Sequence, residues 1–150
     1  MDTTGFRTKN FNKRIEQQHA LLRDFQSLKE NRGREWNGND EFQASYYDFL
    51  HEAGFLTSNA NNKSKDAREK TSELVSLRLI DDARKLTAVG NELLELSSQN
   101  NFSVNNLIGI PADSFIYFEQ LLKTSFTIND KVVRLFVITA YLLSKLGKLS

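Results

Sequence analysis

The chain of 150 residues is 39% apolar, which is enough for one folded domain with a hydrophobic core. Its 20 basic and 19 acidic residues leave a net charge of +1, so the overall charge indicates no polyanionic partner. The absence of Cys excludes disulfides and thiolate metal sites, and two separated His residues cannot form a tetrahedral zinc site by themselves.

The sequence predicts neither a secretion signal nor a membrane span. The residues after Met1 are polar and charged rather than apolar. The most apolar run, residues 135–143, is well short of the roughly 20 residues that cross a bilayer. Together with the lack of Cys, these features favour a cytoplasmic protein without a membrane partner.

Apolar residues recur at helical spacing through most of the chain, so we expect a mainly α-helical fold. A first helix is predicted over residues 15–28, followed by a loop at residues 31–34. A second helix is predicted to start at Asn39 or Asp40, which are good capping residues, and to stop at Gly54.

A charged helix is predicted after the polar loop of residues 57–62, starting at Ser64 or Asp66. Residues 79–86 read as two short extended pieces around a turn, and Thr87 is a good cap for the next helix. This order of elements predicts a winged helix-turn-helix with a short β-hairpin wing. On the charged helix, the expected inward residues are Thr71, Leu74 and Val75, and the expected outward residues are Lys65, Glu69, Ser72 and Ser76.

The winged-helix domain is expected over residues 1–99, and residues 100–150 are expected to add two helices that pack on it. Asp113 is expected to cap the first of these helices, and Asp130 to open the last one, residues 131–146. Because the last helix is apolar on most of its circumference, we expect it to lie between other helices.

No catalytic motif is visible in the sequence: there is no phosphate-binding Gly-rich loop, nucleophile elbow or metalloprotease signature. His19 and His51 fall on predicted helices, where a structural or surface imidazole is more common than a catalytic one. Asp81, Asp82 and Lys85 supply the residue types of a metal-dependent nuclease, but they fall in a tight turn, where carboxylates face solvent. We therefore expect no catalytic residue, metal or cofactor in this chain.

Residues 61–74, "NNKSKDAREKTSEL", combine four cations with three anions. By charge alone they fit either a solvated surface helix or a DNA-recognition helix. In a winged helix-turn-helix this helix enters the major groove with its N-terminal turns foremost, so we expect residues 64–78 to bind double-stranded DNA. The expected contacts are Lys63, Lys65, Arg68, Glu69 and Lys70 on this helix, with Lys65, Arg68 and Glu69 on base edges, and Arg84, Lys85, Arg32 and Arg34 on phosphates.

Trp36 is the only Trp. A large aromatic residue between two predicted amphipathic helices is more often part of the core than a platform for a stacked base. We therefore expect Trp36 to pack between the first and second helices.

Several local patterns resemble the N-terminal region of AlwI-like type IIS restriction endonucleases and their nicking relatives, from about Leu22 to the end of the chain. The order and spacing of these patterns carry the resemblance, rather than any single motif. They are "LRDFQSLKENRGREWNGND", "AREK", "LIDDARKLTAVGNELLEL", "DSFIYFEQLLK" and "VRLFVITAYLLSKLGKLS". The matching positions are Trp36, Gly38, Arg68, Leu86, Thr87, Gly90, residues 120–123, Leu143, Lys145, Gly147, Leu149 and Ser150.

The resemblance implies winged-helix modules that recognise an asymmetric DNA site, followed by a Mg²⁺-dependent nuclease domain that cuts a few bases away. The sequence ends at Ser150 without a strand-borne carboxylate and lysine pair. We therefore expect a recognition fragment that is inactive alone. Its parent would be a monomeric type II site-specific deoxyribonuclease with the nuclease domain in cis.

Two alternatives remain open at this point. One is a winged-helix protein-interaction or dimerisation domain, or a transcriptional regulator, in which the charged helix is only solvated and the last apolar helix forms a subunit interface. The other is a complete small nuclease.

Overall fold

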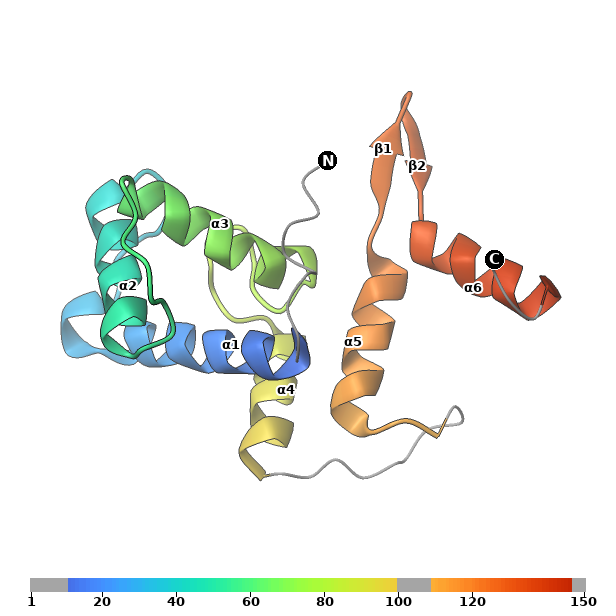
Figure 1. Cartoon of the computed structure of the whole chain (residues 1–150), viewed down its shortest axis with the longest axis horizontal. Helices are drawn as coiled ribbons and strands as arrows, with labels where there is room; N and C mark the ends of the chain where they lie inside the picture. Colours follow the sequence, from blue (N-terminus) through green and yellow to red (C-terminus); the bar gives the residue numbers. More distant parts are fainter. Residues whose placement is uncertain (1–10, 100–108, 147–150) are drawn as a thin grey trace. The chain divides into compact units, whose positions relative to one another are not determined.

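The computed structural model describes residues 11–99 and 109–146 (Figure 1). The chain divides into two compact units, Met1–Asn101 and Phe102–Ser150. The domain boundary expected between residues 99 and 100 adjoins residues 100–108, which lie outside the described ranges, as do Gly147, Leu149 and Ser150 of the resemblance. No helix in the described ranges combines the length and apolarity that a membrane span requires.

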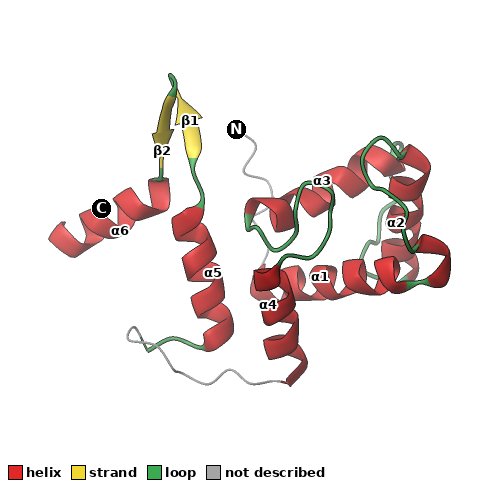
Figure 2. Ribbon diagram, turned by 180° about the vertical axis from the view of Figure 1, so that it is seen from behind, coloured by secondary structure: helices red, strands yellow, loops and turns green. Residues whose placement is uncertain are grey.

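The expectation of a mainly α-helical fold is confirmed, and a small two-stranded antiparallel sheet accompanies the helices (Figure 2). The first unit contains α1 (Phe11–Ser27), the 3₁₀ helix η2 (Lys29–Asn31), α2 (Asp40–Glu52), α3 (Lys63–Ser76) and α4 (Ala88–Gln99). The second contains α5 (Ala112–Lys123), β1 (Phe126–Ile128), β2 (Lys131–Val133) and α6 (Leu135–Leu146). In the first unit α2 packs against α3, and α1 packs against α4 (Figure 1).

Aromatic side chains form the core between α1 and α2. The Phe25 ring stacks on Phe42 with centroids 5.1 Å apart, and Tyr46 lies 5.2 Å from Phe25. Trp36, which is 3% exposed, packs edge-on against Phe42 and Tyr46. The prediction that Trp36 is a core residue is confirmed, and pairs of this geometry add stabilisation beyond the area they bury.

Capping side chains determine where α2 and α3 begin. The Asn39 side chain accepts a hydrogen bond from the Phe42 N–H at 3.0 Å, so the predicted start of α2 is confirmed. Gly54, which has a φ of +70°, follows the end of that helix as predicted. The expected start of α3 at Ser64 or Asp66 is wrong, because Asn62 accepts from the Lys65 N–H at 2.9 Å and α3 already begins at Lys63.

The packing of α3 follows its sequence pattern. Ala67, Thr71 and Leu74 are fully buried, and the Thr71 hydroxyl donates to the Ala67 carbonyl at 3.0 Å. Val75 is only half-buried. All four residues expected to face outward, Lys65, Glu69, Ser72 and Ser76, are exposed as predicted.

The segment expected to form a β-hairpin wing contains a single antiparallel bridge, between Ile80 and Leu86. Inside the bridge the Asp81 N–H donates to the Lys85 carbonyl at 2.9 Å. Pairing stops there because Arg84 has a φ of +62° and its carbonyl accepts from the Gln26 side chain of α1 at 2.6 Å. The two strands of a wing are therefore not formed in this segment.

The β-hairpin of the second unit is where the sequence predicted the start of a helix. Asn129 and Asp130 have φ values of +49° and +61°, which is typical of a type I′ turn, and Phe126 pairs with Val133. The predicted helix over residues 131–146 is therefore wrong at its start, since α6 begins at Leu135. Asp113 is not the cap of α5 either, because that position is occupied by Pro111.

The packing of the last helix on the first unit stays a prediction. Every residue of α6 is exposed, and α6 contacts α5 within the second unit. Its exposed fractions run from 39% at Phe136 to 63% at Leu146 among the large apolar residues. These residues are Leu135, Phe136, Val137, Ile138, Tyr141, Leu142, Leu143 and Leu146.

Candidate nucleic-acid interface

The first turns of α3 present two lysines on its outer side. Lys63 Nζ lies 2.7 Å from Asp48 Oδ1 of α2, and Lys65 Nζ lies 3.6 Å from Glu69 Oε1 one turn along α3. All four side chains are about half exposed or more. Ion pairs of this exposure contribute roughly 0 to 1 kcal/mol, so these lysines can exchange their partners for other anions at little cost.

Arg68 connects α3 to the first turn of α2. Its Nη1 donates to Asp40 Oδ1 at 2.9 Å and to the side-chain oxygen of Gln43. The Arg68 side chain is 43% exposed, and Asp40 is 80% exposed. The structure thus gives Arg68 an intrachain role in orienting α3, in addition to the base contact expected from the sequence.

Lys70 and Arg84 are less exposed than Lys63 and Lys65. The Lys70 carbonyl accepts from Gln18 of α1 at 2.6 Å, and its side chain is half-buried. Arg84 Nε donates to Thr71 Oγ1 at 3.1 Å, and its guanidinium lies 5.7 Å from the centre of the Trp36 ring. Burial lowers the pKa of Arg84, and the nearby Asp82 and Asp81 carboxylates partly oppose that effect. Arg84 therefore holds its segment against the core.

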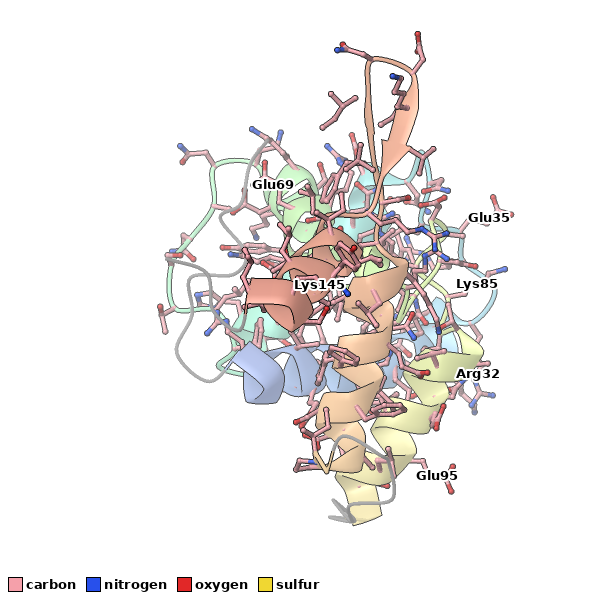
Figure 3. All side chains as sticks on the ribbon, turned by 90° about the vertical axis from the view of Figure 1, so that its right-hand side faces the viewer. Arg32, Glu35, Glu69, Lys85, Glu95 and Lys145 are labelled. Carbon is pink, nitrogen blue, oxygen red and sulfur yellow. The ribbon has the colours of Figure 1, made fainter. Side chains whose placement is uncertain are left out.

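The remaining basic residues of the expected interface lie away from α3. Arg32 is exposed and its Nε donates to the Ser27 carbonyl at 3.2 Å, whereas the Arg34 guanidinium lies 4.6 Å above the Phe42 ring. In Figure 3, Arg32 and Lys85 lie on one side of the first unit together with Glu35, and Glu69 lies on the other. The expected contacts thus divide into an α3 group and a group around residues 32–36 and 85.

A surface cleft of about 380 Å³ lies at this second group. We refer to it as the Trp36 cleft. Its walls come from α1, η2, the loop before α2, the first turn of α2 and the turn enclosed by the Ile80–Leu86 bridge. The side chains that give it chemical character are Gln26, Arg34, Glu35, Trp36, Asn37 and Lys85.

The chain matches no family model, no curated protein and no solved structure. Within residues 11–99 and 109–146, no three His, Asp or Glu side chains are close enough together to hold a metal ion. Function is therefore inferred from the side chains of α3 and of the Trp36 cleft.

Sequence patterns did not predict the cleft. Its walls are assembled from segments up to about sixty positions apart, so no local spacing brings Gln26, Arg34 and Lys85 together. The one local signal was "RGREWNGN", residues 32–39, in which two arginines and two amides flank a Trp. Basic and aromatic residues interleaved in this way are typical of nucleic-acid-binding surfaces.

Proposed function

We propose that the first unit binds double-stranded DNA through α3, as the site-recognition module of a type IIS restriction endonuclease. The observation that carries this proposal is the division of α3 into two faces. Ala67, Thr71 and Leu74 anchor it to the unit, while Lys65 and Glu69 project from its first turns. A helix held on one face and polar on the other fits the major groove of B-DNA.

The charges of α3 support sequence reading more than general attraction to phosphate. Lys65 and Glu69 are both more than 60% exposed, and the 3.6 Å separation of their charged atoms is that of a loose pair. An ammonium can donate to guanine, and a carboxylate can accept from cytosine N4. Lys63 is placed to reach a flanking phosphate once it leaves Asp48.

Arg68 adds a contact that also fixes the helix. Among the described residues only its Nη1 has protein partners, and a guanidinium carries five N–H donors. In the proposed complex Arg68 keeps α3 oriented on Asp40 and presents its other donors to a base edge. In this proposal, a Mg²⁺-dependent nuclease domain of the same polypeptide, outside these residues, hydrolyses the DNA. The protein would be monomeric and cytoplasmic.

Replacing Lys65 by Ala tests the base contact. We expect Lys65→Ala to weaken binding to a duplex selected from a random pool by about tenfold, and to relax the preference at one base pair, because one base-edge contact is worth about 1 to 3 kcal/mol. Fluorescence anisotropy at fixed salt measures the affinity, and repeated selection measures the preference. Lys29→Ala removes the same charge from an exposed position of η2 and is the control. Equal effects of the two variants would contradict base reading by α3.

A second candidate function is subunit association through α6. The observation that favours it is the run of eight large apolar residues on α6, all at least 39% exposed. Soluble proteins rarely leave such a contiguous apolar surface without a partner. A second copy of the chain is the occupant we test, since an isologous contact needs one surface only.

Sedimentation at several concentrations separates the two candidates. If α6 joins two copies, the wild-type chain should sediment as a dimer, and Leu142→Glu should sediment as a monomer because it buries a charge in the interface. Ser72→Glu places the same charge on the exposed side of α3, outside α6, and should leave the dimer intact. A wild-type monomer at every concentration would eliminate this candidate.

A further inference from the structure

The Trp36 cleft has the size and lining of a small-ligand site. Its volume of about 380 Å³ falls within the roughly 300 to 1,000 Å³ of pockets that hold small molecules. Trp36 and Phe42 are buried and form the floor of the cleft. Six polar or charged side chains, those of Gln26, Asn31, Arg34, Glu35, Asn37 and Lys85, line it together with Gly33 and Ala83. An apolar floor with a few polar groups is a common composition of such sites.

Two cations of the cleft are available to an anionic group. The Arg34 guanidinium rests 4.6 Å above the Phe42 ring, a contact with its face that leaves the N–H edges for hydrogen bonds. Lys85 is exposed, and among the described residues no carboxylate lies within ion-pair distance of its Nζ. A phosphate would therefore find two donors that lose no strong partner on binding.

The other polar groups of the cleft suit a ligand that carries hydrogen-bond donors and acceptors in addition to its negative charge. Glu35 is exposed and can accept from hydroxyl or amino groups. The Gln26 side chain uses its nitrogen on the Arg84 carbonyl at 2.6 Å, which leaves its oxygen as an acceptor. The Trp36 indole N–H is buried and has no acceptor among the described residues. An unpaired buried donor is costly, so an acceptor atom that reached it would gain binding energy.

The walls are held in place before any ligand arrives. The Gln26 bond to Arg84 fixes the backbone next to Lys85, and the Arg84 guanidinium lies 5.7 Å from the Trp36 ring and bonds Thr71 of α3. The Asn31 side chain, which is buried, donates to the Phe25 carbonyl at 2.9 Å and fixes the loop that carries Arg34. A site fixed in this way loses little conformational entropy on binding.

We propose that the Trp36 cleft binds one nucleotide, with its phosphate at Arg34 and Lys85 and its base on the cleft floor beside the amides of Gln26 and Asn37. Glu35 accepts from a sugar hydroxyl or a base amino group. A nucleotide carries both the anion that the two cations match and the hydrogen-bonding groups that Glu35 and the two amides match. The unit can be a free mononucleotide or one nucleotide of a DNA strand. The site goes beyond the function proposed for α3, because it does not require α3 to bind a duplex.

The single Trp makes the cleft directly observable. Emission of Trp36, excited where nucleotides absorb little, is followed while the whole chain is titrated with AMP, dAMP, a single-stranded oligonucleotide or inorganic phosphate. We expect saturable quenching by the nucleotides, and an affinity lowered about tenfold in Arg34→Ala because one charge-assisted contact is lost. Lys29→Ala removes one positive charge from the preceding η2 helix, outside the cleft, and should bind like the wild type.

Lys85→Ala is the second variant, and it keeps the test decisive if Arg34→Ala fails to fold, which thermal melting reveals. Quenching by AMP and by the oligonucleotide alike supports a site for a nucleotide from either source, and quenching by one alone identifies that source. No saturable change with any nucleotide, equal binding of inorganic phosphate, or equal losses in the cleft variants and Lys29→Ala would overturn the proposal. A gel shift with duplex DNA, read separately, reports on α3: nucleotide binding without a shift would refute the proposed DNA recognition and leave the cleft site standing.

Discussion

Gly90→Ala should destabilise the first unit by about 3 kcal/mol. This is the upper end of the roughly 1 to 3 kcal/mol that a methyl group added to a packed site typically costs. A Cβ at position 90 would lie 2.0 Å from the Leu79 carbonyl oxygen and 3.0 Å from two atoms of the His19 ring. Helix propensity alone predicts the opposite sign, because Ala favours a helix interior over Gly by about 1 kcal/mol. The direction of the change therefore distinguishes close packing from intrinsic propensity.

The carbonyl that Gly90 approaches has little freedom to move away. Leu79 O accepts from the Thr87 N–H at 3.1 Å and from the Thr87 hydroxyl at 3.0 Å. The same hydroxyl oxygen accepts from the Gly90 N–H at 3.1 Å and so caps α4, as the sequence predicted. Relief of the clash by shifting Leu79 would break this cap, and relief by shifting α4 would open the contact with α1.

Urea unfolding followed by circular dichroism measures the effect. Glu92→Ala, on the exposed side of the same helix, is the control and should change the free energy of unfolding by less than about 0.5 kcal/mol. An alanine variant at position 90 as stable as the wild type would mean that α4 does not approach Leu79 as closely as the geometry requires.

Local signals in the sequence predicted that the first unit's helices exist, although they placed the start of α3 a residue or more too late. Asn39 and Gly54 mark the two ends of α2 through contacts within four residues. The outward and inward residues of α3 follow from helical periodicity. The hairpin of residues 126–133 was missed because its second strand leads directly into an apolar run. Val132 and Val133 were read as the first turn of a helix, whereas Asn129 and Asp130 were the local signal for a turn.

The roles of the basic side chains were harder to predict, since they depend on partners far along the chain. Arg68 finds Asp40 twenty-eight positions away, and Arg84 finds Thr71 thirteen positions away. The spacing of charged residues indicates which side of a helix faces solvent. It does not distinguish a side chain that makes an intrachain contact from one that binds a ligand. The same limit explains why α3 was identified from the sequence and the Trp36 cleft was not.

The pH dependence of stability is the second large effect that we expect, and it comes from His19. The ring is fully buried, and neither nitrogen has a hydrogen-bond partner among the described residues. Burial, with a smaller contribution from the positive charge of Arg23, lowers the pKa of His19 from 6.5 to about 4. The folded chain therefore keeps a neutral imidazole at a pH where the unfolded chain has already bound a proton.

The sign of the effect follows from this difference. Above pH 6.5 both states are neutral at this site, so stability is at its full value. As the pH falls from 6.5 toward 4 only the unfolded state gains the proton, and the free energy of unfolding should fall by up to about 1.4 kcal/mol per pH unit. The fully developed loss is about 3 kcal/mol, and it levels off once the folded state also binds the proton.

His19→Leu separates this effect from other titrations in the same range. Burial raises the pKa of Glu73 while Lys70 and Arg14 oppose the rise, so Glu73 adds stability as the pH falls and works against His19. Because Glu73 is present in both proteins, the difference between wild type and His19→Leu isolates the imidazole. Urea unfolding in steps from about pH 7 to about pH 4 should show that difference growing in favour of the leucine variant as the solution becomes acidic. Parallel curves would mean that the imidazole has the same pKa in the folded and unfolded chains, and would place the acid sensitivity elsewhere. The full burial of the ring, which disfavours its charged form, argues for the diverging curves.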